Sequence, residues 1–195
     1  MFSGASVFNT TLENWNVRNV KNMRFMFASA IAFDQPLNSW RTVNVENMDG
    51  LFFGATSFNQ SLSQWNLGEV TMDSTFERAS SFNQFLGDWD ISQVTNMDDM
   101  LDRSALSREN YDKTLIEWSK QTLNPGIRLG AEGLPYCDAF EERQAIIDTY
   151  GWTINGDILD CPIPECARII TTLRGATNVP VNTNLIWDSV EFARG

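Results

Sequence analysis

Histidine is absent from the 195-residue chain, and cysteine occurs only three times. The absence of histidine excludes a Ser-His-Asp catalytic centre and a His-ligated zinc site. The three cysteines form no Cys-x-x-Cys pair, which also argues against a thioredoxin-type centre and the usual cysteine zinc sites. We therefore expect no catalytic, cofactor-binding or metal-binding residues in this chain.

Basic residues are scarce as well. The chain has 14 Lys and Arg residues against 25 Asp and Glu residues, which gives a formal net charge of −11. Nucleic acid and an anionic lipid surface would both repel such a chain, so neither is an expected partner. No apolar run comes near the ~18 residues that a membrane span needs, and direct membrane insertion is therefore not expected.

A repeat runs from residue 1 to about residue 104, and three anchor positions mark each unit. The anchors are Phe8, Phe33, Phe58 and Phe82, then Leu12, Leu37, Leu62 and Leu86, then Trp15, Trp40, Trp65 and Trp89. Each series steps by 25, 25 and 24 residues, and the missing residue lies between Val70 and Met72. A fixed period in this range is typical of a solenoid, whose units bury their apolar faces against one another.

Two hydrophobic periods alternate within a unit. One segment has the i, i+3, i+4, i+7 spacing of an amphipathic helix, as in Met23, Met26, Phe27 and Ala30. Another alternates at period two, as in Trp15 and Val17, which is typical of a short strand. We predict an α/β solenoid of about four helix–strand units, with a parallel sheet on one face and helices on the other. The expected helices lie near residues 21–31, 46–56, 71–80 and 95–103.

Asn and Asp recur directly after both aromatic anchors. These residues are Asn9, Asp34, Asn59 and Asn83 after Phe, and Asn16, Asn66 and Asp90 after Trp. A column of oxygen-bearing side chains suits calcium. The alternative is an Asn ladder, whose side chains satisfy backbone groups at each turn corner. The ladder is favoured, because only Asp34 and Asp90 are acidic and they fall in different columns.

The units read MFASAIAFDQPLNSW, LFFGATSFNQSLSQWNL and TFERASSFNQFLGDWDISQVTNM. Over residues 1 to about 104 they resemble the MFxxAxxFNQxLxxWDVSNVTNM repeat of the BspA-like leucine-rich-repeat surface proteins of bacteria. Arg41, Thr75 and Leu101 depart from that pattern. The resemblance implies a leucine-rich-repeat-like solenoid with no catalytic motif. It also implies secretion to the bacterial cell surface, in association with the outer membrane.

Residues 105–161 break the period and are predicted to form an α/β cap on the last unit. Ser107 is placed to N-cap a first helix. Asp138 and Glu141 form a capping-box pattern for a second helix, which ends just before Gly151. Short strands are expected at residues 127–129 and 152–154.

Beyond the cap, residues 162–166 contain two prolines and are predicted to form a short, stiff linker. Residues 167–195 resemble the first strands of a fibronectin-type-III-like or Ig-like β-sandwich, and are too few to complete a sandwich of about 100 residues. At the other end, Met1 occupies the repeat's own Met position. We therefore expect a piece of a longer modular protein that continues into further domains of the same chain.

The three cysteines are Cys137, Cys161 and Cys166. In a cytosolic protein they would be inert, buried thiols. The resemblance to surface proteins favours a disulfide instead, and a Cys137–Cys161 bond would clamp the second cap helix to the last strand. Cys166 would then be free or bonded outside this segment, although it could also be the partner of Cys161.

Three functions remain open. The first is a non-catalytic binding and display module in adhesion, whose partner is a protein or glycan on a host or neighbouring cell. The second is a rigid structural spacer in a surface filament. The third, a minor alternative, is a fragment of a carbohydrate-active enzyme with paired carboxylates. The candidate acids are Glu13, Asp88, Asp98, Asp99 and Asp102. A solvated acidic face contains such residues by default, so the sequence favours a non-catalytic protein.

Overall fold

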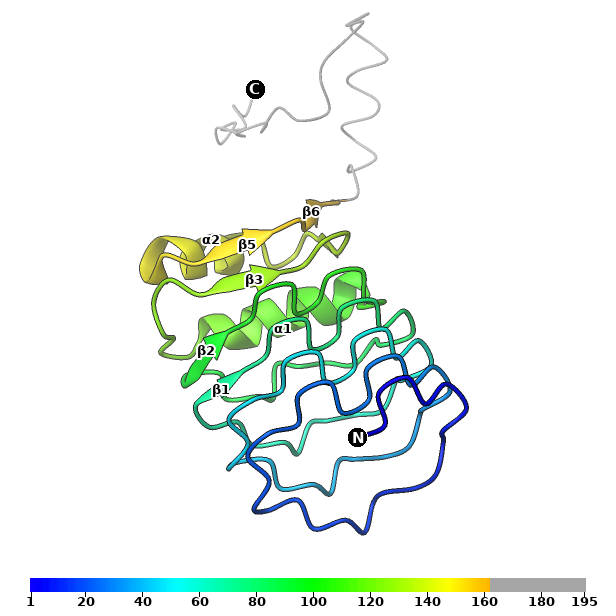
Figure 1. Ribbon diagram of the computed structural model, residues 1–195. Coiled ribbons are helices and arrows are strands. Elements are labelled where there is room, and N and C mark those ends of the chain that lie inside the picture. The colour runs from blue at the N-terminus through cyan, green and yellow to red at the C-terminus, as the bar shows by residue number, and fades with distance from the viewer. Residues whose placement is uncertain (162–195) are drawn as a thin grey trace, which may run out of the picture. The chain divides into compact units, whose positions relative to one another are not determined.

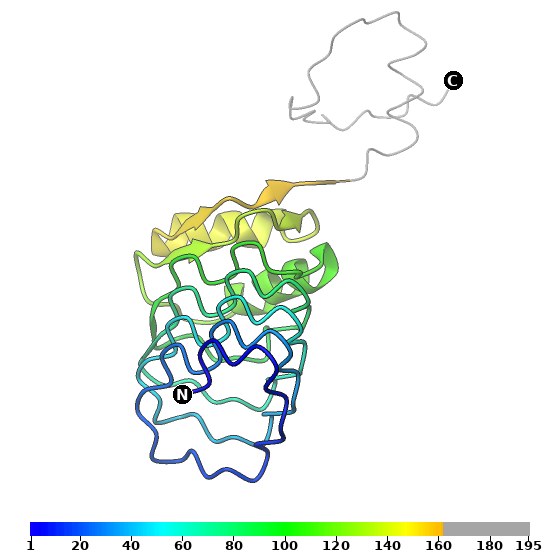
Figure 2. The ribbon, with the colours of Figure 1, turned by 45° about the vertical axis from the view of Figure 1, so that its right-hand side comes forward.

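Alternate backbone N–H groups of the repeat segments donate to the next unit of the chain. The Met23 N–H donates to the Asn47 carbonyl at 2.8 Å, and the Phe25 N–H donates to the Asp49 carbonyl at 2.9 Å. Equivalent bonds connect each later unit to its successor. The computed structural model describes residues 1–161, which form one unit. Figures 1 and 2 show the repeats stacked between the N-terminus and the cap.

The four predicted repeat helices are wrong, because these segments fold as successive turns. Every fourth residue in them has a positive φ, for example Phe25 at 51° and Ser29 at 55°. An α-helix needs negative φ throughout, so a left-handed residue every four positions cannot belong to one. The four-residue period of the turns is close to the 3.6-residue period of a helix. Over two periods, the same apolar positions are therefore compatible with a helix and with a series of four-residue turns.

The parallel strands of the repeats begin near the starts of the predicted helices. Within the described residues, the strands predicted at Trp15 and Trp89 do not form. Strand β1 (Val70–Thr71) pairs in parallel with β2 (Val94–Asn96). Isolated parallel bridges continue this ladder in both directions. They are Asn22 with Asn47, Asn47 with Thr71, and Met97 with Leu129. The ladder therefore includes every unit from Asn22 to the cap.

Paired phenylalanines form the centre of the core. The rings of Phe52 and Phe58, from one unit, stack with centroids 3.9 Å apart. Phe33 of the preceding unit stacks on Phe58 at 5.9 Å. Stacked aromatic pairs contribute about 0.5–1.5 kcal/mol beyond the burial of their area. The same pairing recurs between Phe27 and Phe33 and between Phe76 and Phe82.

The unit that lacks one residue is accommodated locally. The strand register shifts between Val70 and Thr71. Just before it, a Cβ on Gly68 would lie 2.8 Å from the Val43 carbonyl oxygen, so glycine allows the shortened corner to approach its neighbour. Thr71 stands where other units have Asn, and its buried hydroxyl has no hydrogen-bond partner. The deletion therefore changes one rung and leaves the next unit in register.

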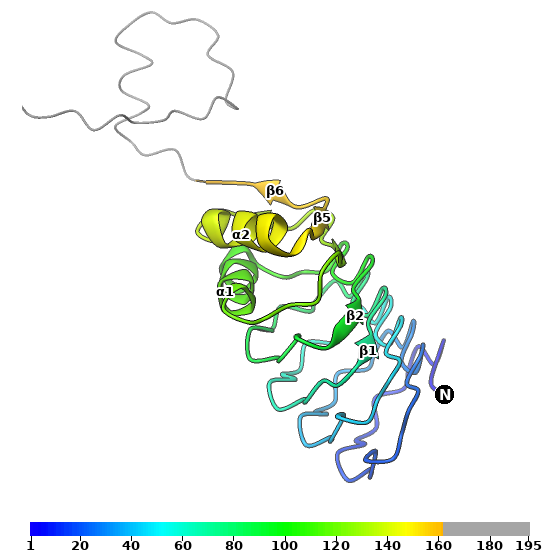
Figure 3. The same ribbon diagram turned by 90° about the vertical axis from the view of Figure 1, so that its left-hand side faces the viewer.

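Two helices and four short strands build the cap. Helix α1 (Arg108–Ser119) packs against α2 (Phe140–Tyr150). Figure 3 shows these helices on the side of the stack opposite β1 and β2. Strand β3 (Arg128–Gly130) pairs in parallel with β5 (Thr153–Asn155), close to the predicted strands. Strands β4 (Pro135–Tyr136) and β6 (Ile158–Leu159), which were not predicted, also pair in parallel.

The helix ends follow the predictions in part. Ser107 accepts the Asn110 N–H at 3.3 Å, which confirms it as the N-cap of α1. Gly151 has φ 66° and ends α2, as predicted. The capping box is wrong, because the N-cap of α2 is Ala139, which makes no side-chain hydrogen bond. The buried carboxylate of Asp112, on α1, instead accepts the backbone N–H groups of the three residues just before α2, Cys137, Asp138 and Ala139.

The predicted division at residue 104 falls inside the unit formed by residues 1–161. The predicted linker at 162–166 and the predicted sandwich start at 167–195 lie outside the described residues, as does Cys166. Among residues 1–161, no helix has the length and apolar character needed to cross a membrane.

Candidate binding surface

A ladder of Asn and Asp side chains fixes one corner of the stack. The Oδ1 atom of Asn9 accepts the Asp34 N–H at 3.0 Å, and Oδ1 of Asp34 accepts the Asn59 N–H at 2.9 Å. Asn59 holds Asn83 in the same way at 2.9 Å, and Asn83 holds Ser107 at 2.8 Å. These bonds confirm the predicted Asn ladder. Asp34 has the same role as its Asn neighbours, because only its acceptor oxygen is used.

A second donor reaches each of these oxygens. The side-chain amides of Gln35, Gln60 and Gln84 donate to the ladder at 2.8–2.9 Å, each to the preceding unit. Asn110 of α1 makes the corresponding bond to Asn83 at 3.0 Å. The described residues contain no group of three His, Cys, Asp or Glu side chains able to hold a metal ion. The ladder oxygens are thus engaged within the protein.

Tryptophan indoles form a second ladder. Trp40, Trp65 and Trp89 donate their Nε1–H groups to the carbonyls of Leu12, Leu37 and Leu62 at 2.9–3.1 Å. Their indole rings are buried, and their centroids lie 6.2–6.3 Å from those of Phe27, Phe52 and Phe76. Each indole therefore joins its unit to the preceding one by both packing and a hydrogen bond.

The other Asn and Asp column, after the Trp anchors, has a local role. Asn16 Oδ1 accepts the N–H of Arg18, and Asp90 Oδ1 accepts the N–H of Ser92. These hydrogen bonds to the residue two positions on are Asx turns. The hydrogen bonds from Ser92 lower the pKa of Asp90. Asp90 and Asp34 are not brought together as calcium ligands.

Sequence reasoning missed a third Asn column, directly before the repeat methionines. Oδ1 of Asn22, Asn47 and Asn96 accepts the N–H two residues later at 2.8–3.0 Å. These turns start the segments that carry the parallel ladder. The recurring Asn-Met pair at these positions was the available signal.

The exposed side of the parallel ladder is the candidate binding surface, here called the ladder surface. Successive backbone bonds place Asp49, Asp73 and Asp98 on adjacent rungs. A neighbouring column contains Glu77, Asp102 and Glu132. Three arginines partly neutralise these two columns. Arg78 lies 3.4 Å from Glu77, Arg103 lies 2.8 Å from Glu132, and Arg128 lies 3.5 Å from Asp98. The surface is therefore acidic over the later units.

Burial and the repulsion of neighbouring carboxylates raise the pKa of two acids on this surface. Burial raises the pKa of Asp73, and the nearby carboxylates of Asp49, Asp99 and Asp98 raise it further, against a hydrogen bond from Ser74 that lowers it. Asp102 also has a raised pKa, chiefly through burial, with added repulsion from Asp99 and Glu132. A cation approaching this surface would relieve the repulsion.

The first full rung of the same surface is aromatic and basic. Phe25 lies over Gly50, where a Cβ would meet the phenylalanine ring at 2.1 Å. The Arg24 guanidinium also lies over that ring, 5.0 Å from its centroid. Phe25 remains 40% exposed. The ladder surface therefore changes from basic and aromatic at Arg24 to acidic at Asp49 and beyond.

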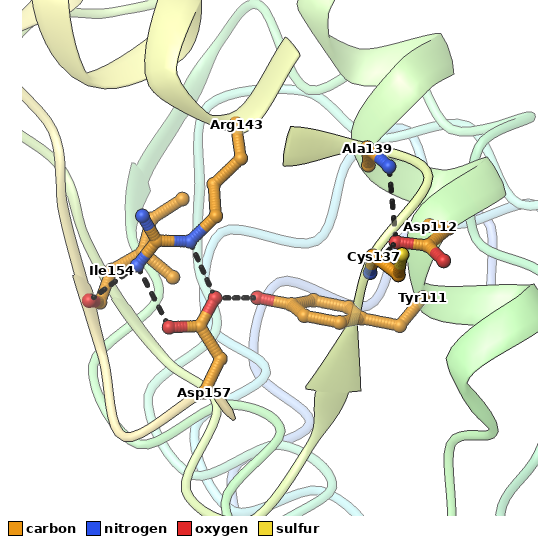
Figure 4. Close-up of polar contacts among 7 residues, drawn as sticks. All are labelled: Tyr111, Asp112, Cys137, Ala139, Arg143, Ile154 and Asp157. Atoms are coloured by element: carbon orange, nitrogen blue, oxygen red, sulfur yellow. Dashed lines mark hydrogen bonds and ion pairs between the residues drawn. The ribbon is translucent and has the colours of Figure 1, made fainter. Parts of the chain in front are cut away.

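The cap contains a buried polar cluster, shown in Figure 4. Asp157 accepts two hydrogen bonds from Arg143, at 2.6 and 2.7 Å, and one from the Tyr111 hydroxyl at 3.1 Å. Burial and the neighbouring Asp157 raise the pKa of Tyr111 well above its ordinary value, so the hydroxyl keeps its proton. The Arg143 guanidinium also lies 4.8 Å from the centre of the Tyr136 ring. All three polar groups are paired, and the cluster stabilises the cap.

Cys137 and Cys161 form a disulfide, with Cα atoms 4.9 Å apart. The predicted pairing is therefore present in the structure. The predicted clamp between helix and strand is wrong, because the bond joins the ends of the parallel strands β4 and β6. Those strands were not visible in the sequence.

Six of the eight aromatic anchors are buried, namely Phe33, Trp40, Phe58, Trp65, Phe82 and Trp89. Phe8 is half-buried and Trp15 is 43% exposed, because both belong to the first unit. Among the candidate acids, Asp98, Asp99 and Asp102 share the ladder surface, as the interactions of Asp73 and Asp102 show. Glu13 and Asp88 are exposed and do not enter these interactions.

Comparison with known proteins gives one family. A family model described as "Mycoplasma protein of unknown function, DUF285" matches residues 1–72 and 69–124. No curated protein and no solved structure matches the chain.

Proposed function

The chain belongs to the DUF285 repeat family, and we propose that it is a non-catalytic binding and display module of a secreted bacterial cell-surface protein. We further propose that the stack is a leucine-rich-repeat-like solenoid of the BspA-like type. Its partner would be a protein or glycan on a host or neighbouring cell. The chain would be displayed at the cell surface in association with the outer membrane.

One observation carries the proposal: a repeating apolar interior supports a charged column on the ladder surface, basic at its first rung and acidic at the next three. The methionine that begins each rung is buried every time, as Met23, Met48, Met72 and Met97. The next residue is Arg24, then Asp49, Asp73 and Asp98. Stacked repeats present such columns as one extended surface, which is how repeat proteins build binding surfaces.

The charge of the ladder surface indicates what it would bind. Asp49, Asp73 and Asp98 form a line of carboxylates on adjacent rungs. Asp99, near Asp73, and Asp102, near Asp99, add further negative charge. Complementary charge speeds association and selects among partners. A protein surface rich in Lys and Arg is therefore favoured over a neutral glycan.

The disulfide supports export. A bond such as Cys137–Cys161 persists in oxidising compartments and is rare in the cytosol. It joins the residues that follow the paired strands β4 and β6 of the cap.

The test compares the whole chain with a triple variant, D49K/D73K/D98K. Both are screened against arrays of glycans and of host and bacterial surface proteins, at low and raised salt. We expect binding to at least one basic protein, weakened by salt and abolished in the variant. The matched control is E109K/E141K/D148K, which makes the same charge change at exposed positions of α1 and α2. Equal loss in both variants would mean that net charge, and not the ladder surface, decides binding.

A structural spacer is the alternative that one observation favours. The N-terminus and strand β6 lie toward opposite ends of the stack, as a rigid connector requires (Figure 1). Absence of binding across the arrays, for a chain that is shown to be folded, would favour this alternative.

A further inference from the structure

The unit that lacks one residue interrupts a column of exposed side chains. Lys21, Glu46 and Thr95 each follow a valine at the start of a ladder segment, and all three are exposed. The shortened unit has no residue at this place, because Thr71 pairs with Asn47 and so occupies the position after it. The column therefore consists of Lys21, Glu46, a missing side chain and Thr95.

A hollow of about 390 Å³ lies at the interruption. Its lining includes Glu46, Thr71 and Thr95, together with Glu69 from the shortened corner and Val43 from the unit before it. Ligand pockets in proteins commonly have volumes of about 300–1,000 Å³. The deletion thus leaves a polar hollow that is large enough to take a bound group.

One residue that lines the hollow has an unsatisfied polar group. The hydroxyl oxygen of Thr71 is buried and has no hydrogen-bond partner among residues 1–161. The Thr95 hydroxyl, by contrast, donates to the Val70 carbonyl at 3.2 Å. Buried polar groups in native proteins generally have partners. The unpaired hydroxyl is therefore a second indication, independent of the shape, that the hollow accommodates a bound group.

The charges that line the hollow favour a cation. The Lys21 ammonium lies 2.7 Å from the Glu46 carboxylate, one rung before the missing side chain. Glu69 also lines the hollow and makes no ion pair within residues 1–161. The lining thus has two carboxylates and one ammonium. A second ammonium at the missing place would lie one rung after Glu46, as Lys21 lies one rung before it.

We propose that the hollow binds the ammonium end of a lysine side chain from the protein partner, between Glu46 and Glu69. The inference rests on the proposed function for the source of that lysine. An ammonium has three donors and suits acceptors on different segments, whereas the planar guanidinium of arginine matches a single carboxylate. Val43, which is 51% exposed, provides an apolar contact for the methylene stem.

A partner on the ladder surface is within reach of the hollow. Glu46 and Thr95 each precede an aspartate of that surface, Asp49 and Asp98, by three residues. Three extended residues span at most about 10–11 Å. The aspartates recur from rung to rung, so a basic partner bound to them alone could shift by one unit. The hollow occurs at the shortened unit, and a lysine bound there fixes the register of the partner.

The first experiment titrates the full chain with Nα-acetyl-lysine amide and follows the NMR signals of the Glu69 and Thr95 backbone amides. We expect saturable shifts, at least about threefold weaker binding of the arginine analogue, and no binding of the norleucine analogue, which lacks the ammonium. E46Q/E69Q should weaken lysine binding at least about threefold, whereas E13Q/E141Q, which removes the same charge at exposed positions elsewhere, should not. No shift with the lysine compound, or equal loss in both variants, would overturn the inference.

An insertion provides a second test. A lysine inserted between Val70 and Thr71 restores the 25-residue period and should fill the hollow with the chain's own ammonium. The lysine compound should then no longer bind. The inserted lysine should also give a higher melting temperature than an inserted methionine, and E46Q/E69Q should remove the difference. Binding that persists in the folded insertion variant would place the site elsewhere and overturn the inference.

The inference and the proposed function fail separately. A basic protein whose binding is abolished by D49K/D73K/D98K but is not weakened by E46Q/E69Q would leave the ladder surface as the site and refute the role of the hollow. Binding of the lysine compound with no protein partner on the arrays would make the ligand a free amine and refute a protein source.

Discussion

Trp118 donates its indole N–H to the carbonyl of Leu86 at 3.1 Å, which is the contact that Trp89 makes with Leu62 one unit earlier. Helix α1 therefore presents to the last repeat the same side chain that another repeat would present. Ser107 and Asn110 do likewise for the Asn ladder, through Asn83. The cap ends the stack by imitating its next unit.

Replacing Trp118 by Phe should destabilise the chain by about 1–3 kcal/mol, because the buried Leu86 carbonyl would lose its donor. The matched control is W15F, at an indole that is 43% exposed, where the loss should be within ~0.5 kcal/mol. Urea unfolding followed by circular dichroism measures both. Equal losses would show that the imitation of a repeat by α1 contributes nothing to stability.

Replacing Phe58 by Ala should cost about 3–5 kcal/mol, because a ring stacked on both Phe52 and Phe33 would leave a cavity between units. Q64A changes an exposed side chain and should fall within ~0.5 kcal/mol. The comparison is made by urea unfolding at one pH. A loss below 1 kcal/mol for F58A would contradict the assigned core.

The Asn ladder predicts that charge at its positions is dispensable while the acceptor oxygen is not. D34N keeps Oδ1 and should be nearly neutral in stability, whereas N59L removes the acceptor used by Asn83 and Gln84 and should cost about 1–3 kcal/mol. Thermal unfolding with calcium and with a chelator provides the control. A calcium-dependent rise in melting temperature that D34N abolishes would restore the calcium interpretation.

The carboxyl of Asp73 should destabilise the folded chain at neutral pH. Its folded pKa is raised above 3.8, so the folded state binds the proton more tightly, and stability falls as pH rises through that range. D73N should therefore raise the melting temperature at pH 7. The gain in the free energy of unfolding should be less than about 1 kcal/mol, because the group is partly exposed. The gain should vanish near pH 3.

Asp90 is the control with opposite sign. Its folded pKa is lowered, so its contribution is present above the unfolded pKa of 3.8 and is lost as pH falls. D90N should lower the melting temperature at pH 7 and have little effect near pH 3. Melting curves for both variants between pH 3 and pH 7 decide the matter. The same sign for D73N and D90N would refute the assignment of these shifts.

Removal of the disulfide by C137S/C161S should destabilise the cap by about 3 kcal/mol, since the bond closes a loop with a sequence separation of 24. Hydrogen exchange should show the loss first in β4 and β6. The earlier units should retain their protection, because their backbone bonds do not involve these strands. Uniform loss of protection would indicate that the whole stack unfolds with its cap.

The repeat made part of this structure predictable. A 25-residue frame places equivalent residues on neighbouring units, so Phe33 and Phe58 were expected to meet, and an Asn column had few satisfied arrangements other than a ladder. The turns were not predictable in this way. Over the eight residues from Met23 to Ala30, periods of 3.6 and 4 select the same apolar positions. What separates them is the hydrogen bond from Met23 to Asn47, which lies between units and leaves no mark within one.

The cap shows a different limit. Its polar cluster joins Tyr111 to Asp157, which are 46 residues apart, and no spacing rule relates them. The backbone N–H groups before α2 are bound by Asp112, which lies on α1, so the local capping-box pattern at Asp138 was misleading. Candidate surface residues were found only as a list of acids, because the sequence does not show that Asp73 and Asp98 lie on adjacent rungs.

The direction of the backbone bonds between units has a mechanical consequence. Bonds such as Phe25 to Asp49 and Phe76 to Met100 join successive units along the stack. A pulling force applied at the two ends loads these few bonds in series, so the stack should peel from its weaker end one unit at a time. Each step releases about 25 residues, or roughly 80–90 Å of extended chain. The disulfide excludes the residues between Cys137 and Cys161 from that extension, and the cap should be the part that yields least.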